Sequence, residues 1–230
     1  MSILTDVLFL FISPHCPVCG AYLLDEERTF CSSCRLTAPF TGYSANADNP
    51  MFRSFMGIVP VESATALIHF SQNGWRKAIH EFKYRGAWRI ALDFGKWVGH
   101  DLLSSDLFRG VDMVVPVPLH PFKKIIRGYN QSDYIAKGVA QVLQVPVSTT
   151  NVVRRHYNRS QTRTRKSKRW SNVQEIFAVR HPEQFAGKHI LLVDDVFTTG
   201  ATITSCALAI IQSAPDVRIS VATIATAHSI

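Results

Sequence analysis

The chain has 230 residues, of which 47% are apolar, so it fits one large domain or one domain with a small module. This composition excludes wholesale disorder. No apolar run approaches the roughly 20 residues of a membrane span, and we therefore expect no span and a cytoplasmic protein. The formal charge of +8 equals the eight Arg and Lys residues of one acid-free stretch, RRHYNRSQTRTRKSKR (154–169). This clustering predicts a local anion site rather than a generally basic surface.

The chain divides into three predicted parts. Residues 1–40 are rich in cysteine and turns, residues 41–60 are rich in Gly, Asn, Ser and Pro and are predicted to be a linker, and residues 61–230 are predicted to form one domain. Apolar patterns in that domain predict, in chain order, a strand at 64–71, helices at 75–85 and 88–105, a strand at 111–119, a helix at 130–144 capped by Asn130, weak strands at 145–149 and 176–179, a strand at 188–193, a helix from Gly200 to about Ser213, and a strand at 217–226. Strands that alternate with helices indicate an α/β fold with a mostly parallel sheet flanked by helices.

Four of the five cysteines form two pairs, CPVCG (16–20) and CSSC (31–34). Two CxxC pairs at this separation can surround one tetrahedral ion, and thiolates suit Zn²⁺. Because cysteine fills all four positions, no coordination position stays open, so we expect a structural zinc site made by Cys16, Cys19, Cys31 and Cys34. A rubredoxin-like iron site and two redox pairs are the alternatives. Cys206 stands apart from these and is expected to be a buried apolar residue.

The stretch HILLVDD (189–195) places Asp194 and Asp195 at the carboxyl end of a buried strand, where open α/β sheets bind ligands. The following residues, VFTTGAT (196–202), combine hydroxyl groups with a glycine before a predicted helix. Such a turn makes a nest of backbone N–H groups that suits a phosphate. Two carboxylates beside this nest would repel a phosphate unless a neutral group lay between them. A sugar fits, so the stretch predicts a ribose 5-phosphate site.

Three other interpretations of this stretch compete with a sugar-phosphate site. A response-regulator domain needs about 100 residues after such a strand, and only 35 follow Asp195. A P-loop ATPase also has a strand that ends in acids, but the chain lacks GxxxxGK[ST]. The third alternative is an ordinary capped helix after a strand, with solvated acids.

The segment ILLVDDVFTTGAT (190–202) resembles the signature of type I phosphoribosyltransferases, which bind phosphoribosyl pyrophosphate (PRPP) with Mg²⁺. The resemblance implies that Asp194 and Asp195 are the catalytic acids and hold the ribose hydroxyls. It also implies that the following loop binds the 5-phosphate through Val196, Phe197, Thr198, Thr199, Gly200, Ala201 and Thr202.

A four-cysteine module ahead of this signature resembles the ComF/GntX family, as do FKYRG (82–86) and VPVPLH…RGYNQS (115–132). In this fold, basic groups meet the pyrophosphate of PRPP, and a loop closes over the substrate and excludes water. The resemblance therefore assigns pyrophosphate contacts to the loop at 118–130 and the mobile loop at 154–169, through Lys123, Lys124, Arg127, Arg159, Arg163 and Arg169.

The family resemblance implies a protein that binds PRPP or a nucleotide and acts in natural competence, DNA uptake and DNA utilisation. Single-stranded DNA and competence-machinery proteins are the implied partners, and Tyr157 and Trp170 beside the arginines suit base stacking. The alternative is an active purine or pyrimidine phosphoribosyltransferase of nucleotide salvage with no DNA role. No acceptor-base site is identifiable, so the sequence leaves open whether the protein is an enzyme. A scaffold for partner proteins is a third possibility.

Overall fold

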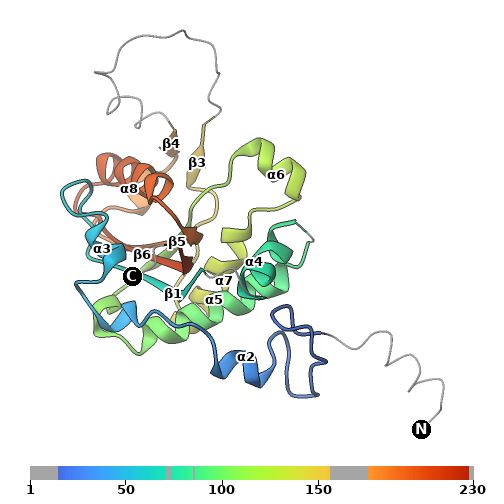
Figure 1. Cartoon of the computed structure of the whole chain (residues 1–230). Coiled ribbons are helices and arrows are strands. Elements are labelled where there is room, and N and C mark those ends of the chain that lie inside the picture. Colours follow the sequence, from blue (N-terminus) through green and yellow to red (C-terminus); the bar gives the residue numbers. More distant parts are fainter. Residues whose placement is uncertain (1–14, 71–73, 85, 156–175, 228–230) are drawn as a thin grey trace, which may run out of the picture.

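A four-stranded parallel sheet forms the centre of the computed structural model, which describes residues 15–70, 74–84, 86–155 and 176–227. The strand order is β1 (Ser63–His69), β6 (Arg218–Thr226), β5 (His189–Phe197) and β2 (Met113–Pro116). Each neighbouring pair is parallel. The predicted α/β fold with a mostly parallel sheet flanked by helices is thereby confirmed (Figure 1).

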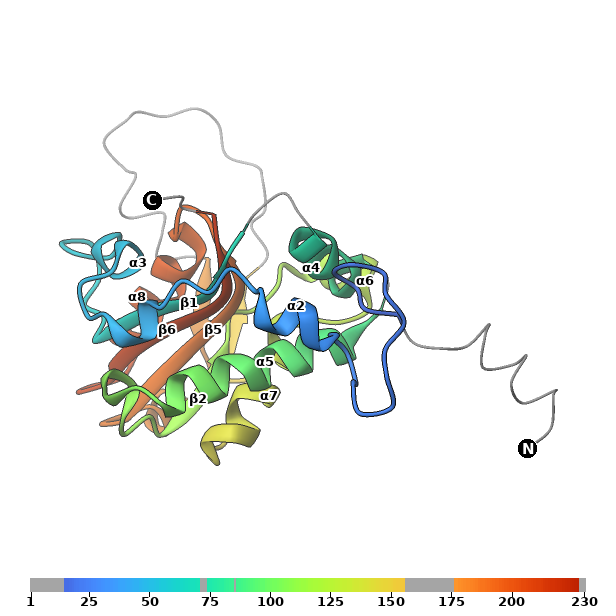
Figure 2. The same cartoon turned by 60° about the horizontal axis from the view of Figure 1, so that its bottom comes forward.

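Helices cover both faces of this sheet. On one face lie α4 (Gly74–Tyr84), α5 (Trp88–Leu103) and α7 (Gln131–Leu143), and on the other lie α8 (Ala201–Ser213) and the short α3 (Pro50–Arg53) (Figure 2). Successive side chains of a strand point to opposite faces, so Leu191 and Val193 join the first core while Ile190 and Leu192 join the second. This double burial explains why β5 is apolar at every position from Ile190 to Val193 rather than alternating with polar residues.

Several small elements were absent from the sequence-based prediction. The strands β3 (Val152–Arg154) and β4 (Phe177–Val179) form an antiparallel pair, and only the second was predicted. The predicted strand at 145–149 is reduced to a single bridge between Val147 and Val114. Short helical turns complete the described elements: α2 (Ser32–Leu36), η1 (Tyr43–Ala45), η2 (Asp106–Phe108) and η4 (Pro182–Gln184).

The loop predicted at 118–130 contains a helix, α6 (Pro121–Arg127), so that prediction was wrong. Its prolines suggested a turn. However, proline is well suited to the first turn of a helix because its missing N–H needs no partner there, and His120 accepts a hydrogen bond from the Phe122 N–H at 3.2 Å as a cap. Gly128 ends the helix in a left-handed conformation.

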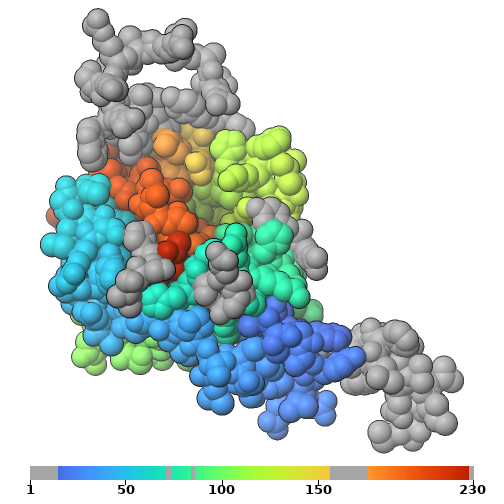
Figure 3. Space-filling model, in the orientation of Figure 1, coloured from blue at the N-terminus to red at the C-terminus, as the bar shows by residue number. Residues whose placement is uncertain are grey.

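Residues 41–60, the predicted linker, lie against the sheet. Met51 and Phe55 are each 1% exposed and belong to the core that α8 shares. The side chain of Asn49 caps α3 and donates from Nδ2 to the Ala64 carbonyl of β1 at 2.8 Å. In Figure 3 the light-blue residues of this segment adjoin the orange residues of α8. The division of the chain into module, linker and domain stays a prediction.

None of the helices in the described ranges has the length and apolar character needed to cross a bilayer.

The helices α5 and α7 pack with their backbones in direct contact. A Cβ added at Gly138 of α7 would lie 2.1 Å from the Leu92 carbonyl oxygen and 2.7 Å from the Lys96 nitrogen of α5. Neither backbone atom can move without displacing its helix. Close packing at this glycine therefore sets the spacing of the two helices that cover the first face of the sheet.

We predict that Gly138→Ala lowers the free energy of unfolding by about 1–3 kcal/mol, the usual cost of overpacking a core. Helix propensity alone would give the opposite sign, since alanine is favoured over glycine by about 1 kcal/mol in an exposed helix. Urea unfolding measures the difference, with Gln141→Ala at an exposed position of the same helix as the control. An unchanged or more stable Gly138→Ala protein would contradict this packing.

Candidate functional site

Two adjacent carboxylates lie in the carboxyl-terminal half of β5. The strand continues through Asp194 and Asp195 to Phe197 instead of ending at Val193 as predicted. Asp195 is only 7% exposed, and Asp194 is partly buried. The pair therefore lies inside the sheet, in register with β6, rather than on a solvated loop. Of the alternatives weighed from the sequence, the one with solvated acids is excluded by this burial.

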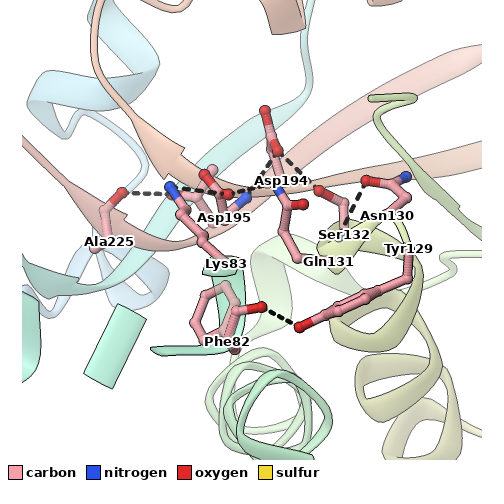
Figure 4. A network of polar contacts seen from close by, with 10 residues as sticks. Phe82, Lys83, Tyr129, Asn130, Gln131, Ser132, Asp194, Asp195 and Ala225 are labelled. Carbon is pink, nitrogen blue, oxygen red and sulfur yellow. Dashed lines mark hydrogen bonds and ion pairs between the residues drawn. The ribbon is translucent and has the colours of Figure 1, made fainter. Parts of the chain in front are cut away.

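Side chains from two helices surround the pair (Figure 4). Gln131 Nε2 donates to Asp195 Oδ2 at 2.7 Å, and Lys83 Nζ lies 3.0 Å from the same oxygen. Asp194 Oδ1 accepts from Ser132 Oγ at 2.9 Å and from the Asp195 backbone N–H at 2.8 Å. Buried charges are stable only when paired or hydrogen-bonded, and these contacts meet that condition.

The sequence folds so that α7 begins at the acidic pair. Asn130 accepts from the Ser132 N–H at 3.4 Å, which confirms it as the cap, and its Nδ2 donates to the Val117 carbonyl at 3.2 Å. Because this bond ties the cap to the chain leaving β2, Gln131 and Ser132 of the first turn are held beside β5. The positive end of the helix dipole also faces the acids and favours their ionised form.

The pKa of Asp194 is raised to about 7, first by burial and then by the neighbouring charge of Asp195, against the opposing effect of Ser132 and Lys83. Across the cavity, burial lowers the pKa of Arg154, an effect that the charge of Asp194 opposes. Arg154 also lies over the ring of Phe177, with its guanidinium 5.5 Å from the ring centre. The two carboxylates therefore have too little positive charge around them. A bound hydrogen-bond donor or cation would stabilise their ionised forms.

The loop that follows the acids turns directly into α8. Gly200 caps the helix with a left-handed φ of 72°, and a Cβ there would lie 2.7 Å from the Phe197 ring. Glycine meets both constraints. Phe197 is fully buried against Phe55, so the strand end is fixed while Thr198 and Thr199 are exposed. A hollow of ≈ 40 Å³ lies in this bend, lined by Asp194 and by residues 196–203.

One cavity of ≈ 380 Å³ brings the acidic pair, the loop and several cations together. Thr198 and Thr202 line it from the loop, Lys123 and Arg127 from α6, and Arg154 from β3. Lys123 and Arg127 share a helix face because they are four residues apart. Lys124 is exposed and is not among the residues lining this cavity. Arg159, Arg163 and Arg169 lie outside the described residues.

Four residues of the site were not assigned a role from the sequence: Lys83, Gln131, Ser132 and Arg154. The first three lie in FKYRG and RGYNQS, two segments that resemble the ComF/GntX family. This resemblance was the signal that could have identified them. Their contacts with β5 join residues that are far apart in the sequence, so no local pattern of residues predicts them. Arg154 begins the basic stretch and had no separate signal.

The four cysteine sulfurs lie within 4.8 Å of one another. Cys19 Sγ and Cys31 Sγ are 3.6 Å apart, close to the roughly 3.8 Å between ligands of a tetrahedral ion with 2.3 Å bonds to sulfur. A disulfide would need about 2.05 Å. Burial disfavours the Cys16 thiolate, but N–H groups of Cys31 and Cys19 outweigh it and lower its pKa to about 7. These cysteines could hold one metal ion.

Known proteins resemble this chain in sequence. A family model for the phosphoribosyl transferase domain matches residues 131–229, from the first residue of α7 to beyond β6. Competence protein F of Haemophilus influenzae is 33% identical over 94 residues, which cover 40% of this chain and 41% of that protein. DNA utilization protein YhgH of Escherichia coli K12 is 24% identical over 201 residues, which cover 86% of this chain and 84% of that protein.

These similarities support a ComF-like family for this chain. The matched phosphoribosyl transferase domain and the four-cysteine cluster agree with this assignment, and the fold is that of the type I phosphoribosyltransferases. Among solved structures, the glutamine PRPP amidotransferase of B. subtilis aligns with 64% of this chain and 30% of its own, at 16% identity and a TM-score of 0.46. In this ComF-like chain, the matched domain includes the acidic pair, the threonine loop and two of their partners, Gln131 and Ser132.

We predict that Asp194→Asn stabilises the protein at alkaline pH. A folded pKa near 7, above the unfolded value of about 3.9, means that the folded state binds the proton more tightly. Wild-type stability therefore falls as the pH rises from about 4 to 7. The variant has no such loss, so its advantage should grow by about 1–3 kcal/mol between pH 5 and pH 8.

Urea unfolding at several pH values measures this difference. Asp106→Asn, at an exposed carboxylate that pairs with Arg109 at 2.7 Å, is the control for removing an acid elsewhere. A gap between Asp194→Asn and wild type that stays constant with pH would contradict a raised pKa.

Proposed function

We propose that this ComF-like protein binds PRPP, or another ribose 5-phosphate ligand such as a nucleotide, in the cavity between β5, α6 and α7. The observation that supports this most strongly is the shared cavity itself: the acids, the threonine loop and the basic face of α6 all line one space of ≈ 380 Å³. A ligand with neutral hydroxyls at its centre and phosphates at both ends matches this order of groups.

In this proposal the ribose hydroxyls donate to Asp194 and Asp195. Gln131 adds a further reason to expect a hydroxyl, because within the described residues its buried Oε1 has no hydrogen-bond partner. Buried acceptors of this kind are rare unless a ligand or water satisfies them. The Gln131 amide would thus hold Asp195 with its nitrogen and accept from the ligand with its oxygen.

The phosphates would occupy the two positive regions of the cavity. Backbone N–H groups at the bend around Gly200, with the hydroxyls of Thr198 and Thr202, would bind the 5-phosphate. Lys123, Arg127 and Arg154 would face the pyrophosphate, where fixed positive charge stabilises the departing group if transfer takes place. Mg²⁺ bound with PRPP would supply further neutralisation of the pyrophosphate.

We further propose that the ion held by the four cysteines is zinc and that its role is structural. Four thiolates fill a tetrahedral shell and leave no position for a substrate. The short segment around them gains folding free energy from the metal.

The names of the two relatives favour a role in DNA uptake and utilisation over nucleotide salvage, because one is a competence protein and the other a DNA utilization protein. We place this chain in the same process, in the cytoplasm, with competence-machinery proteins as partners. Salvage of a purine or pyrimidine base is the alternative. It would require an acceptor-base site beside the anomeric carbon, and an assay of base-dependent pyrophosphate release distinguishes the two.

A second candidate function, single-stranded DNA binding, is favoured by the surface of α6. Phe122, Ile125 and Ile126 are 64%, 79% and 65% exposed, an unusual density of apolar surface on one helix turn. Lys124 of the same helix is also exposed, and α6 appears as the yellow-green projection at the edge of the molecule in Figure 3. Aromatic rings beside cations are the usual means of binding unpaired nucleotides.

We predict that the protein binds PRPP with Mg²⁺ and that Asp195→Asn weakens this affinity by at least about tenfold, or about 1.4 kcal/mol. The substitution preserves shape but removes the charge that accepts from the ribose. Thr202→Val should also weaken PRPP binding, because it removes a hydroxyl that would bind the 5-phosphate. Isothermal titration calorimetry of the full chain measures both effects.

Each substitution has a control of the same residue type. Thr204→Val changes a threonine of the same helix that does not line the cavity, and Asp106→Asn changes an exposed acid. If Asp195→Asn and Thr202→Val both bound PRPP with wild-type affinity, neither the acids nor the loop would be part of the ligand site.

For single-stranded DNA, we predict that Phe122→Ala weakens binding by about 1–3 kcal/mol through lost stacking, with the salt dependence unchanged. Lys124→Ala should instead reduce the slope of log affinity against log salt by about 0.7, the share of one phosphate contact. Fluorescence anisotropy with labelled oligothymidine from about 50 to 200 mM salt measures both. Lys188→Ala, at the opposite end of β5, is the control. A salt-independent or undetectable signal would exclude this function.

A further inference from the structure

Lys83 connects the acidic pair to the four-cysteine module. Its side chain is 20% exposed, and it comes from the last turn of α4, a helix that begins beside the cysteines. We propose that Lys83 is a positioning residue for Asp195, and that the metal-bound module sets its place by holding helix α4. The effect on ligand affinity rests on the proposed function, whereas the effect on Lys83 itself does not.

The first step is the contact between the module and the start of α4. A Cβ added at Gly74 would lie 1.9 Å from the carbonyl oxygen of Val18, so the two backbones touch. Val18 lies between Cys16 and Cys19, inside the first cysteine pair. The shape of this pair depends on the metal, because without it four thiol groups have no common centre. The metal site therefore fixes the position at which helix α4 begins.

The second step is the aromatic packing around Phe30, which precedes Cys31 and is 6% exposed. Its ring centre lies 5.6 Å from that of Trp75 in α4 and 4.8 Å from that of Phe94 in α5. It also stacks on Trp97 at 5.3 Å with an interplanar angle of 4°. One side chain of the module thus fills the space between α4 and α5. In Figure 2 the blue module lies directly beside both helices.

The third step is transmission along α4. Ala78, Ile79 and Phe82 are 0–2% exposed and pack into the same core as Phe30. Trp75 and Lys83 are eight residues apart, about 12 Å along a helix, so a rotation at the first turn moves the last. At that end the Tyr129 hydroxyl donates to the Phe82 carbonyl, which links α4 to the residues just before Asn130 (Figure 4).

The consequence concerns the charge at Asp195. Lys83 Nζ and Gln131 Nε2 both contact its Oδ2, and Asp195 is itself almost fully buried. If α4 moves, Asp195 loses its cation while the charge of Asp194 remains next to it. Removing one partner of a buried ion pair is costly because the other charge is left uncompensated. Loss of the metal would therefore disorganise a ligand site that the module does not line.

The first experiment needs no ligand. Lysine acylation with a water-soluble acetyl ester, read residue by residue by mass spectrometry, is compared in the metal-loaded full chain and after chelation. We expect Lys83 labelling to rise about fivefold or more as its burial is lost, while labelling of Lys188 stays within about twofold. Equal Lys83 labelling in both states, or an equal rise at Lys188 from general unfolding, overturns the proposal.

Phe30→Ala tests the same path without touching the metal ligands. Its metal content should stay at the wild-type level, while Lys83 labelling rises as it does on chelation. Leu24→Ala is the control, since this leucine of the module is 72% exposed. A metal-loaded Phe30→Ala protein with wild-type Lys83 labelling overturns the proposed route through α4.

The second experiment asks whether the ligand senses the module through Lys83. Phe30→Ala should weaken PRPP affinity about tenfold, a typical coupling between sites. The same substitution should have less than about a twofold effect in a Lys83→Met background, since coupled residues are not additive. Lys83→Arg, which keeps the charge, should restore the sensitivity. Additive losses in the double variant overturn the proposal. If wild type binds no PRPP at all, the proposed function fails, and the labelling experiment still decides the coupling.

Discussion

The structure depends on the burial of two adjacent carboxylates in a central strand. Placing both charges in β5 is unfavourable on its own, and the pKa of Asp194, raised to about 7, reflects that cost. Three segments offset it: α7 with Gln131 and Ser132, α4 with Lys83, and β3 with Arg154. A fold that needed only stability would replace these acids with apolar residues, as it does at Leu192 and Val193. Their retention at the edge of a cavity indicates a function.

The same constraint explains how the layers of the fold meet. The first face of the sheet carries α4, α5 and α7, and the core they form extends without interruption to Cys16, Cys31 and Cys34. The cysteine module therefore packs against the helices that support the site. The second face carries α8, whose first turn continues the threonine loop after the acidic pair. Binding groups thus reach one cavity from both layers.

Strong local signals made much of this predictable. The apolar run of β5, the helix after Gly200 and the cap at Asn130 are encoded within a few residues, and the cysteine spacing predicted the cluster that the structure forms. The helix α6 was missed because its prolines resemble those of a turn. The contact of Lys83 with Asp195 was missed because it depends on how α4 packs against the rest of the fold, which no local sequence pattern predicts. Packing of residues 41–60 was hidden by their turn-rich composition.

The proposed function requires one arrangement, in which neighbouring acids hold a pentose and the threonine bend holds its phosphate. A crystal structure of the full chain with ribose 5-phosphate tests it most directly. The account predicts sugar density within hydrogen-bonding distance of Asp194 and Asp195, with the phosphate on the N–H groups between Thr198 and Thr202. A ligand bound elsewhere, or a bend that is closed by side chains while the sugar is present in excess, would contradict it.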